Sequence, residues 1–289
     1  MTFTCNLCGA RNTVDVMVTE PSTCACGSNV RLRSLIHLLS LEIFGESLIL
    51  KDFPRMKSIR GFGMTDKDCL APLAEKFDYT NTHYDREPRL DITQPHPELE
   101  GKFDFLLSAD VLEHIAGPVA PAMEEMCRLL KPNGFAGITI FCNPQDQMRE
   151  HFPNLHDYRL VSLGGRMVLV NRRADGTLEA HDNLIFHGGT GSTLEIREFG
   201  VTALRDQLLS AGFKDVLLLT EEVPEIGIVI DHDLSQPLLA RKEPYALGPE
   251  SRAELVRMWR KSDEQLRLAR DSRWLKLGRA LRVGPDFKW

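Results

Sequence analysis

The sequence predicts an α/β protein with a mostly parallel, doubly wound sheet. From Met56 onward, short apolar stretches of strand length alternate with stretches of helical periodicity. This alternation is typical of units in which helices connect parallel strands and cover both faces of one sheet. The 289 residues suffice for one large domain of this kind with attachments, and the 43% hydrophobic and 26% charged residues are close to the average of globular proteins.

Composition and cysteine usage exclude several other classes of protein. No apolar run reaches the roughly 18 residues that a membrane-spanning helix needs, and residues 1–10 show neither the basic start nor the apolar stretch of a signal peptide. We therefore expect a cytoplasmic protein without a transmembrane segment. The 7 cysteines do not form the even, dispersed set of a secreted disulfide framework. The net charge of -6 disfavours general nucleic-acid binding.

Two cysteine pairs near the N-terminus have the spacing of metal ligands. Cys5 and Cys8 are followed by a glycine, and Cys24 and Cys26 form a second pair across a loop. Four thiolates satisfy the tetrahedral preference of Zn²⁺ and leave no position open, so such a site is structural and performs no chemistry. Apolar and polar residues alternate at 13–18, which we expect to form a strand. So short a strand needs a stabilising element such as a bound zinc ion. The sequence thus predicts a zinc-knuckle segment at residues 1–45, with unligated or redox-active thiols as the alternative.

The rest of this segment is predicted to be a helix. Ser28 or Asn29 can cap its start, and Gly45 ends it. Arg31 and Arg33 fall in the first turn, where positive charge is unfavourable to the helix dipole. We interpret both as solvated surface residues, with contact to an anionic group as the alternative. The apolar residues that recur at helical spacing are Leu32, Leu35, Ile36, Leu39 and Ile43.

The central elements follow in order along residues 57–142. A strand at 57–60 leads into Gly61-Phe62-Gly63, which we interpret as a glycine-rich turn before a helix at 69–77. This succession lets the backbone approach a bound nucleotide closely. The remaining predicted elements are strands at 79–84, 89–92 and 102–108, a helix at 119–130 that the following proline and glycine end, and a strand at 135–142.

Two neighbouring motifs carry a family resemblance. Phe103-Asp104 leads through Ser108-Ala109-Asp110-Val111-Leu112-Glu113-His114-Ile115, and Leu129-Leu130-Lys131-Pro132-Asn133-Gly134 follows the next helix and precedes an apolar strand. This pair resembles the middle of the class I S-adenosylmethionine-dependent methyltransferases, and the resemblance covers residues 55–145 and 200–240. It implies a Rossmann-like sheet of seven strands, with a helix at 201–212, a sixth strand at 216–219 and a last, antiparallel strand region beginning at 225–230. It also implies methyltransferase activity, with S-adenosylmethionine (SAM) as the methyl donor.

The resemblance further implies that the cofactor lies at the carboxyl edge of the sheet. A glycine-containing loop approaches its methionine and ribose part, an acidic residue after the second strand binds the ribose, and one after the third lies by the adenine. Ile59 and Arg60 stand where the family has an acidic residue, and we expect Asp66 to compensate. A turn or helix-cap carboxylate is the alternative for Asp91, and Glu87 is the alternative to Asp85. Carried over by position, the cofactor-binding residues are Gly61, Phe62, Gly63, Asp66, Asp85, Asp91, Ser108, Ala109 and Asp110.

A long insert at residues 151–200 is expected to shape the acceptor pocket, because in this family an insert at that position sits over the methyl donor. Apolar stretches at 166–171 and 177–180 flank Asp175-Gly176, a strong hairpin signal. An imidazole suits the base that deprotonates a hydroxyl acceptor. We predict His187, beside a glycine-rich loop, then His156, beside a carboxylate, and then His114, with a structural hydrogen-bonding role as the alternative for each.

These features predict a SAM-dependent methyltransferase domain at residues 46–248. The polar insert and the cysteine-rich start are similar to methyltransferases of bacterial sugar and glycan pathways, which implies a hydroxyl of a sugar, glycan or related small molecule as the acceptor. A zinc-containing RNA methyltransferase is one alternative. The net negative charge of residues 1–248, the acidic body of the chain, disfavours it. A non-catalytic scaffold with a degenerate cofactor site is the other.

Residues 249–289 form a basic tail, with 11 basic and 6 acidic residues. Leu255, Met258, Trp259 and Leu266 are spaced as an apolar stripe along a helix. We expect this helix to pack on the acidic body. Binding to an anionic partner or a membrane surface is the alternative.

Overall fold

The computed structural model describes residues 1–15, 23–64, 68–143, 145–187, 192–230 and 235–272. The chain forms two compact units, residues 1–246 and 247–289. Within the described residues, every helix is too short or too polar to cross a membrane.

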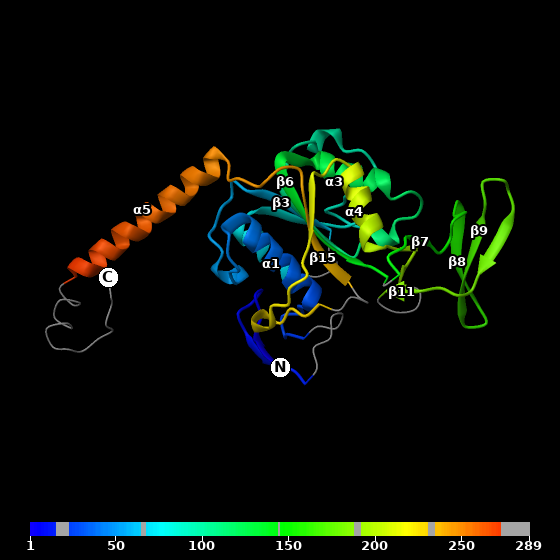
Figure 1. The fold of residues 1–289 in the computed structure, drawn as a ribbon, viewed down its shortest axis with the longest axis horizontal. Helices are drawn as coiled ribbons and strands as arrows, with labels where there is room; N and C mark the ends of the chain where they lie inside the picture. The colour runs from blue at the N-terminus through cyan, green and yellow to red at the C-terminus, as the bar shows by residue number, and fades with distance from the viewer. Residues whose placement is uncertain (16–22, 65–67, 144, 188–191, 231–234, 273–289) are drawn as a thin grey trace. The chain divides into compact units, whose positions relative to one another are not determined.

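A six-stranded sheet forms the centre of the first unit (Figure 1). The strands from β6 to β4 run parallel, whereas β15 is antiparallel to both of its neighbours. Because β3 lies between β4 and β5, the chain winds outward in both directions from the middle of the sheet, as predicted for a doubly wound fold. In spatial order the strands are β14 (Asp215–Leu218), β15 (Ser235–Arg241), β6 (Leu130–Phe141), β5 (Phe103–Ala109), β3 (Arg60–Met64) and β4 (Asp78–Thr82).

The central sheet has six strands among the described residues, where the resemblance implied seven. The expected strand at 89–92 is reduced to a single parallel bridge between His83 and Arg89. Pro88 precedes this bridge and has no N–H to donate, and residues 84–89 are exposed. Leu90 and Ile92 are buried in the core, and the Leu90 N–H donates to the His83 carbonyl at 2.9 Å, but the pairing extends no further and the described part of the sheet ends at β4.

Helices cover both faces of the sheet (Figure 1). On one face, α1 (Val30–Phe44) packs over β6, where a Leu35 methyl group lies 3.5 Å from the position that a Cβ on Gly137 would take. On the other face, α3 (Ala120–Leu129) and α4 (Val201–Ser210) place Met126 and Leu204 in one core with Leu106 of β5. This layered packing is the α/β architecture that the sequence predicts.

Helix α1 has the predicted ends. The Asn29 side chain accepts a hydrogen bond from the Leu32 N–H at 3.1 Å, and Gly45 follows the helix in the left-handed conformation. The expected helix at 69–77 is split into η2 (Asp68–Leu70) and α2 (Leu73–Lys76), and β6 begins at Leu130, ahead of the predicted start at 135. The other short 3-10 turns are η1 (Leu50–Asp52), η3 (Pro97–Leu99), η4 (Leu112–His114) and η5 (Pro224–Ile226).

Gly61 and Gly63 lie within β3, which corrects the prediction of a turn at these residues. A Cβ on Gly61 would sit 2.2 Å from the Phe105 ring, and one on Gly63 would sit 1.9 Å from the Tyr79 hydroxyl. The two aromatic rings stack with centroids 6.0 Å apart. The glycines are therefore needed to make room for these rings beside the strand.

Short antiparallel pairs make up the parts outside the central sheet. β1 (Thr2–Thr4) pairs with β2 (Arg11–Thr13), and residues 16–18 of the expected strand at 13–18 lie outside the described residues. The expected start of the last strand, at 225–230, is instead η5 and a single bridge between Val223 and Ile228, and β15 begins only at Ser235.

The insert contains the predicted hairpin, formed by β9 (Arg166–Arg172) and β10 (Leu178–His181) around Asp175-Gly176. A third strand that the sequence reasoning did not predict, β8 (Asp157–Leu163), pairs with β9. Two further pairs close the insert, β7 (Arg149–Glu150) with β13 (Arg197–Glu198) and β11 (Phe186–His187) with β12 (Thr193–Leu194).

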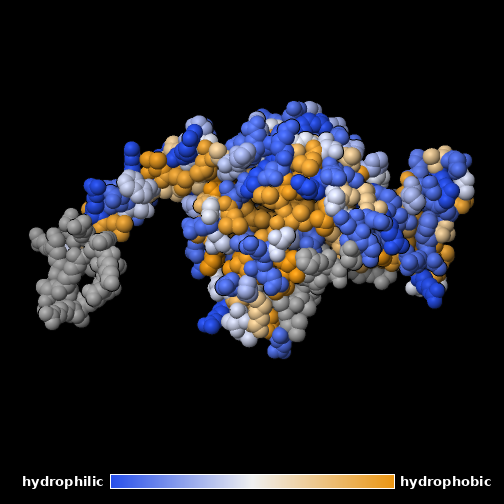
Figure 2. All heavy atoms as spheres, in the orientation of Figure 1, coloured by the Kyte–Doolittle hydropathy of each residue, from blue (hydrophilic) through white to orange (hydrophobic). Residues whose placement is uncertain are grey.

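The second unit contains the predicted tail helix, α5 (Pro249–Asp271), which carries all four residues of the expected apolar stripe. Figure 2 shows apolar and charged residues side by side along this helix. Residues 273–289 lie outside the described part of the chain.

Candidate functional site

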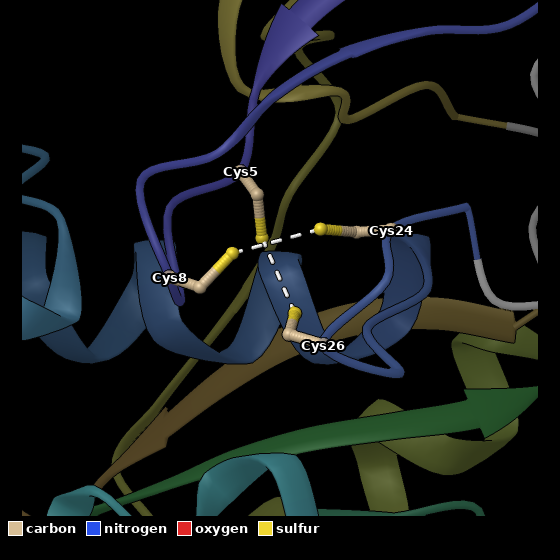
Figure 3. Close-up of side chains that lie close together, drawn as sticks. All are labelled: Cys5, Cys8, Cys24 and Cys26. Carbon is tan, nitrogen blue, oxygen red and sulfur yellow. Dashed lines mark hydrogen bonds between the residues drawn. The ribbon is translucent and has the colours of Figure 1, made fainter.

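The four N-terminal cysteines converge. Their sulfur atoms all lie within 4.8 Å of one another. Cys5 Sγ is 3.8 Å from Cys26 Sγ, and Cys8 Sγ is 3.6 Å from Cys24 Sγ. Figure 3 shows the four side chains pointing toward a common centre from two separate turns. Four sulfur atoms in this arrangement fit the donor set of a structural zinc ion.

Arg33 is fully buried beside this cysteine cluster, which corrects the prediction of a solvated residue. Its guanidinium donates to the Gly227 carbonyl at 2.8 and 3.1 Å and to the Ser28 carbonyl at 3.3 Å. It also lies 4.6 Å from the centroid of the Phe3 ring. Burial lowers the pKa of Arg33, whereas the neighbouring cysteine thiolates raise it. Arg33 is therefore a buried cation beside the cysteine cluster, and main-chain carbonyls satisfy its guanidinium.

Asp110 directly follows β5 at the carboxyl edge of the sheet, in a left-handed conformation with φ 49°. Its Oδ2 accepts a hydrogen bond from Ser235 Oγ at 2.8 Å and forms an ion pair with Arg31. The Arg31 side chain is only 15% exposed, so contact with an anionic group is the correct interpretation of this arginine. The ion pair joins α1 to the carboxyl end of β5.

Three buried oxygen atoms near this edge have no hydrogen-bond partner among the described residues: Ser108 Oγ, Asp110 Oδ1 and Thr139 Oγ1. Thr139 lies on β6 directly opposite Ala109 of β5. A buried polar atom without a partner costs about 1–3 kcal/mol. Such atoms are expected where a ligand or an ordered water supplies the missing bond.

The other residues predicted to bind the cofactor lie in varied surroundings. Phe62 is buried in the core, and the centroid of its ring lies 4.7 Å from that of the Phe103 ring. Asp85 is exposed beyond the end of β4. Asp91 Oδ1 accepts from the Thr93 N–H at 3.1 Å and from its hydroxyl at 2.6 Å, the turn that the sequence left as the alternative. Asp66 lies outside the described residues, and the part of each in cofactor binding stays a prediction.

Two histidines of the insert share one carboxylate. His151 Nε2 lies 2.8 Å from Glu195 Oε1, and His187 Nε2 lies 2.7 Å from Glu195 Oε2. His114, in η4 just after β5, packs edge-to-face on His187 with ring centroids 4.8 Å apart. Its Nδ1 lies 2.8 Å from the Leu194 carbonyl oxygen. The β11–β12 pair thus brings the insert onto the segment that follows the carboxyl end of β5.

Electrostatics fixes the charge of the shared carboxylate. Burial raises the pKa of Glu195, but its hydrogen bonds with His151 and His187 outweigh burial and lower the pKa to about 2. Burial lowers the pKa of His114, so this imidazole is neutral at neutral pH. An ionised, buried carboxylate therefore orients two imidazoles at this edge of the sheet.

Arg197 anchors the histidine cluster, which consists of Glu113, His114, His151, His187 and Glu195. Its side chain is 1% exposed and donates to the carbonyl oxygens of Leu112 at 3.1 Å and Ile115 at 2.7 Å, as well as to that of Gly117. It also pairs with Glu150 Oε1 at 2.7 Å. The arginine therefore holds the turn after β5 against the end of the insert.

The structure brings His187 and His114 together, whereas His156 is exposed and is not among the residues of this cluster. The sequence reasoning missed Glu195 and Arg197 as site residues. Both alternate with apolar residues in the segment 194–199, a pattern that predicts a strand with its charges toward solvent. The sequence pattern therefore indicated that Glu195 and Arg197 are exposed.

The chain is similar to several known proteins. Residues 74–138 match the family model described as a methyltransferase domain. No curated protein sequence matches the chain. Among similar solved structures are a 1,6-didemethyltoxoflavin N1-methyltransferase of Burkholderia thailandensis (16% identity, 74% of this chain and 78% of that chain, TM-score 0.39) and a sugar N-methyltransferase of Streptoalloteichus (14%, 72% and 85%, TM-score 0.40). A third is a possible histamine N-methyltransferase of Thermotoga maritima (16%, 74% and 90%, TM-score 0.41).

The family match spans α2, β4, β5, α3 and the first part of β6, and therefore includes Asp110 and the turn with Glu113 and His114. These are the residues at the carboxyl edge of the sheet on which the resemblance rests. The match confirms the prediction of a SAM-dependent methyltransferase at the level of a methyltransferase domain.

Proposed function

We propose that the protein transfers a methyl group from SAM to a hydroxyl of a sugar, glycan or related small molecule. The observation that carries this proposal is that buried oxygens without a partner among the described residues lie at the carboxyl ends of β5 and β6, while His114, just beyond β5, packs on the His187 ring that Glu195 orients. The first group suits a polar ligand at the carboxyl edge, and the second suits deprotonation of an acceptor. The sugar acceptor rests on the resemblance of the insert and the cysteine-rich start to methyltransferases of glycan pathways.

The carboxyl edge fits the polar parts of SAM. The ribose hydroxyls, the adenine amino group and the ammonium group of the methionine part are donors, and Ser108 Oγ, Asp110 Oδ1 and Thr139 Oγ1 are buried atoms that can accept. SAM supplies a methyl group on a positively charged sulfur. We infer that Ser108 and Asp110 hold the cofactor, with Ala109 beside it.

His187 is the base in this proposal. Glu195 accepts the proton on Nε2 of its ring, which leaves the lone pair on Nδ1 to take a proton from the acceptor. As the hydroxyl proton moves to Nδ1, the oxygen bonds to the methyl carbon. The carbon–sulfur bond breaks, and its electron pair stays on the sulfur of S-adenosylhomocysteine. The enzyme contributes chiefly alignment, because the displacement is in line.

The cysteine cluster is proposed to hold a structural zinc ion through Cys5, Cys8, Cys24 and Cys26. The convergence of four sulfur atoms and the buried Arg33 beside them support this assignment. All four positions of the tetrahedron are filled by thiolates, so the ion takes no part in methyl transfer.

Calorimetric titration with S-adenosylhomocysteine tests the cofactor site. We expect the full-length protein to bind it and Ser108→Val to bind at least about tenfold more weakly, because the variant replaces a polar contact worth roughly 1.4 kcal/mol. Ser162→Val, an exposed change on β8, is the matched control. Absence of binding in the wild type contradicts the proposal and favours the non-catalytic scaffold.

Transfer of labelled methyl groups tests the acceptor. Label is expected in sugar-nucleotide or glycan fractions and not in RNA or protein fractions, and label in RNA favours the zinc-containing RNA methyltransferase. His187→Ala should abolish most turnover while cofactor binding persists. His156→Ala, at an exposed position outside the histidine cluster, serves as the comparison. Unchanged turnover in both His187→Ala and His156→Ala rules out either histidine as the base.

A further inference from the structure

Glu113, His114 and His187 form a compact set of metal-ligating side chains. One ligand atom of each lies within 4.8 Å of the others. The first two come from η4 after β5 and the third comes from β11 of the insert, so the set exists only in the folded chain. Glu113 is completely buried. A buried carboxyl group facing two imidazoles differs from the exposed acidic clusters common on protein surfaces.

The hydrogen bonds of the two imidazoles fix which nitrogen of each is left with a lone pair. A carbonyl oxygen only accepts, so His114 Nδ1, 2.8 Å from the Leu194 carbonyl, carries a hydrogen and Nε2 carries the lone pair. An ionised carboxylate also only accepts, so His187 Nε2, 2.7 Å from Glu195 Oε2, carries a hydrogen and Nδ1 carries the lone pair. Metal-binding histidines are typically held in this way, with the second ring nitrogen donating to a carbonyl or a carboxylate.

We propose that Glu113, His114 and His187 bind one first-row divalent cation, to which the hydroxyl of the acceptor coordinates. Two imidazole nitrogens and one carboxylate suit Mn²⁺, Fe²⁺, Co²⁺ or Zn²⁺, and three protein ligands leave positions open in an octahedral shell. The cation acts as a Lewis acid that lowers the pKa of the bound hydroxyl. This inference rests on the proposed methyl transfer for its purpose, but the binding of the cation itself does not.

The surroundings of the three residues preorganise them. Glu195 ties His187 to His151, and His151, Glu195 and Glu198 form a second close group that supports the first. The Ile196 N–H donates to the Glu113 carbonyl at 2.9 Å. Together with the contacts of Arg197 to the same turn, these bonds hold the ligands from β5 and from the insert in one geometry.

The cation changes the role of His187. Its Nδ1 lone pair can take a proton or bind a metal, but not both at once. With the cation bound, the acceptor proton leaves to solvent from an already acidified hydroxyl, and the alkoxide attacks the methyl carbon as above. The imidazole then positions the acceptor through the metal and does not titrate during the reaction.

Binding of Mn²⁺ to the full-length, zinc-loaded protein tests this proposal without any turnover. Mn²⁺ favours nitrogen and oxygen ligands over thiolates, so it distinguishes this site from the cysteine cluster. The free ion is counted by electron paramagnetic resonance during titration. We expect one bound Mn²⁺ per chain.

Three conservative variants remove one ligand atom each and keep the neighbouring hydrogen bond. His114→Asn retains a donor toward the Leu194 carbonyl, His187→Gln retains a donor toward Glu195, and Glu113→Gln is isosteric. Each should raise the Kd for Mn²⁺ by at least about tenfold, since even changes behind the ligands cost 10–100-fold. The matched controls are His181→Asn and Glu98→Gln, which lie outside the three residues and should leave the Kd unchanged. Circular dichroism of every variant establishes that it is folded.

The outcomes separate the cation site from the proposed function. If the wild type binds no stoichiometric Mn²⁺, or if folded His114→Asn and His187→Gln bind it as well as the controls do, the cation site is overturned. S-adenosylhomocysteine binding is measured on the same samples. Mn²⁺ binding that requires the three residues in a protein without cofactor affinity supports the cation site and overturns the proposed methyl transfer.

Discussion

The cysteine cluster and the histidine cluster (Glu113, His114, His187, His151 and Glu195) are both groups of metal-ligating side chains, yet they are assembled in opposite ways. The four cysteines lie within one short segment, and two tight turns bring them together. The histidine cluster joins the turn after β5 to residues of the insert, from Glu113 to Glu195 along the chain. The first site is therefore local, and the second depends on the packing of the insert against the central sheet.

The two clusters also share one feature. Each lies beside a fully buried arginine that binds main-chain carbonyls far away in the sequence, Arg33 to Gly227 and Arg197 to the turn at 112–117. Among the described residues, these two arginines are the largest of the fully buried side chains. The guanidinium satisfies several acceptors at once, so one arginine can fix the position of a loop whose own hydrogen bonds are incomplete. The local and the non-local cluster are therefore anchored by the same physical device.

The largest effect is expected from loss of the cysteine ligands. Cys5→Ser should abolish zinc binding and unfold the N-terminal segment, because structural zinc contributes apparent binding free energies of about 10–16 kcal/mol. Elemental analysis of the purified protein and circular dichroism measure both results. Cys69→Ser, a change outside the cluster, should retain zinc. A wild-type protein purified without zinc would contradict the assignment of the cysteine cluster as a metal site.

The next effect concerns the two buried arginines. Arg33→Met and Arg197→Met should each lower the free energy of unfolding by about 3 kcal/mol or more, because each leaves several buried carbonyl oxygens without a donor. Urea denaturation measures the change. The exposed Arg205→Met on α4 should stay within about 0.5 kcal/mol of the wild type. Arg33→Met should weaken zinc retention and leave the affinity for Mn²⁺ unchanged. Arg197→Met should weaken Mn²⁺ binding and leave zinc retention unchanged. Equal effects of one variant on both ions would contradict the idea that each arginine anchors its own cluster.

Destabilising the sheet should affect metal binding at the two clusters differently. Gly61→Ala should lower the free energy of unfolding by about 1–3 kcal/mol, because its Cβ meets the Phe105 ring. Release of Mn²⁺ should then occur at a lower urea concentration, while zinc release moves less because the thiolates are neighbours along the chain. Gly61→Ala combined with Phe105→Leu should recover part of the loss. Release of both ions together at every urea concentration would show that the cysteine cluster is not an independent unit.

The smallest expected effect is that of Glu195→Gln. The amide keeps the shape of the side chain but weakens its bonds to His151 and His187, so Mn²⁺ affinity should fall by about 10–100-fold. Zinc content should be unchanged. Titration with Mn²⁺ on matched samples provides the measurement, and an unchanged Kd would mean that the orientation of His187 does not depend on this carboxylate.

The pattern of apolar residues was sufficient to predict the order of most central elements. The strand at β5, the helix α3 and the capped helix α1 follow from periodicity and end signals that act within a few residues. The implied seventh strand does not form at 89–92: Leu90 and Ile92 are buried, but Pro88 has no N–H to donate and the pairing is limited to one bridge between His83 and Arg89. The glycines of β3 also misled, since a glycine indicates freedom of the backbone and does not reveal which ring occupies the space of its missing side chain.

The alternating architecture, the methyltransferase motifs after β5 and the convergence of the four cysteines could all be predicted from the sequence, because spacing along the chain sets all three. The pairing of Arg31 with Asp110, the burial of Arg33 and Arg197, and the joining of two histidines by Glu195 depend on the folded chain. In each of these cases the partners come from distant segments. A charged residue is read from sequence as solvated, since burial costs free energy, and only the fold supplies the partners that offset the cost.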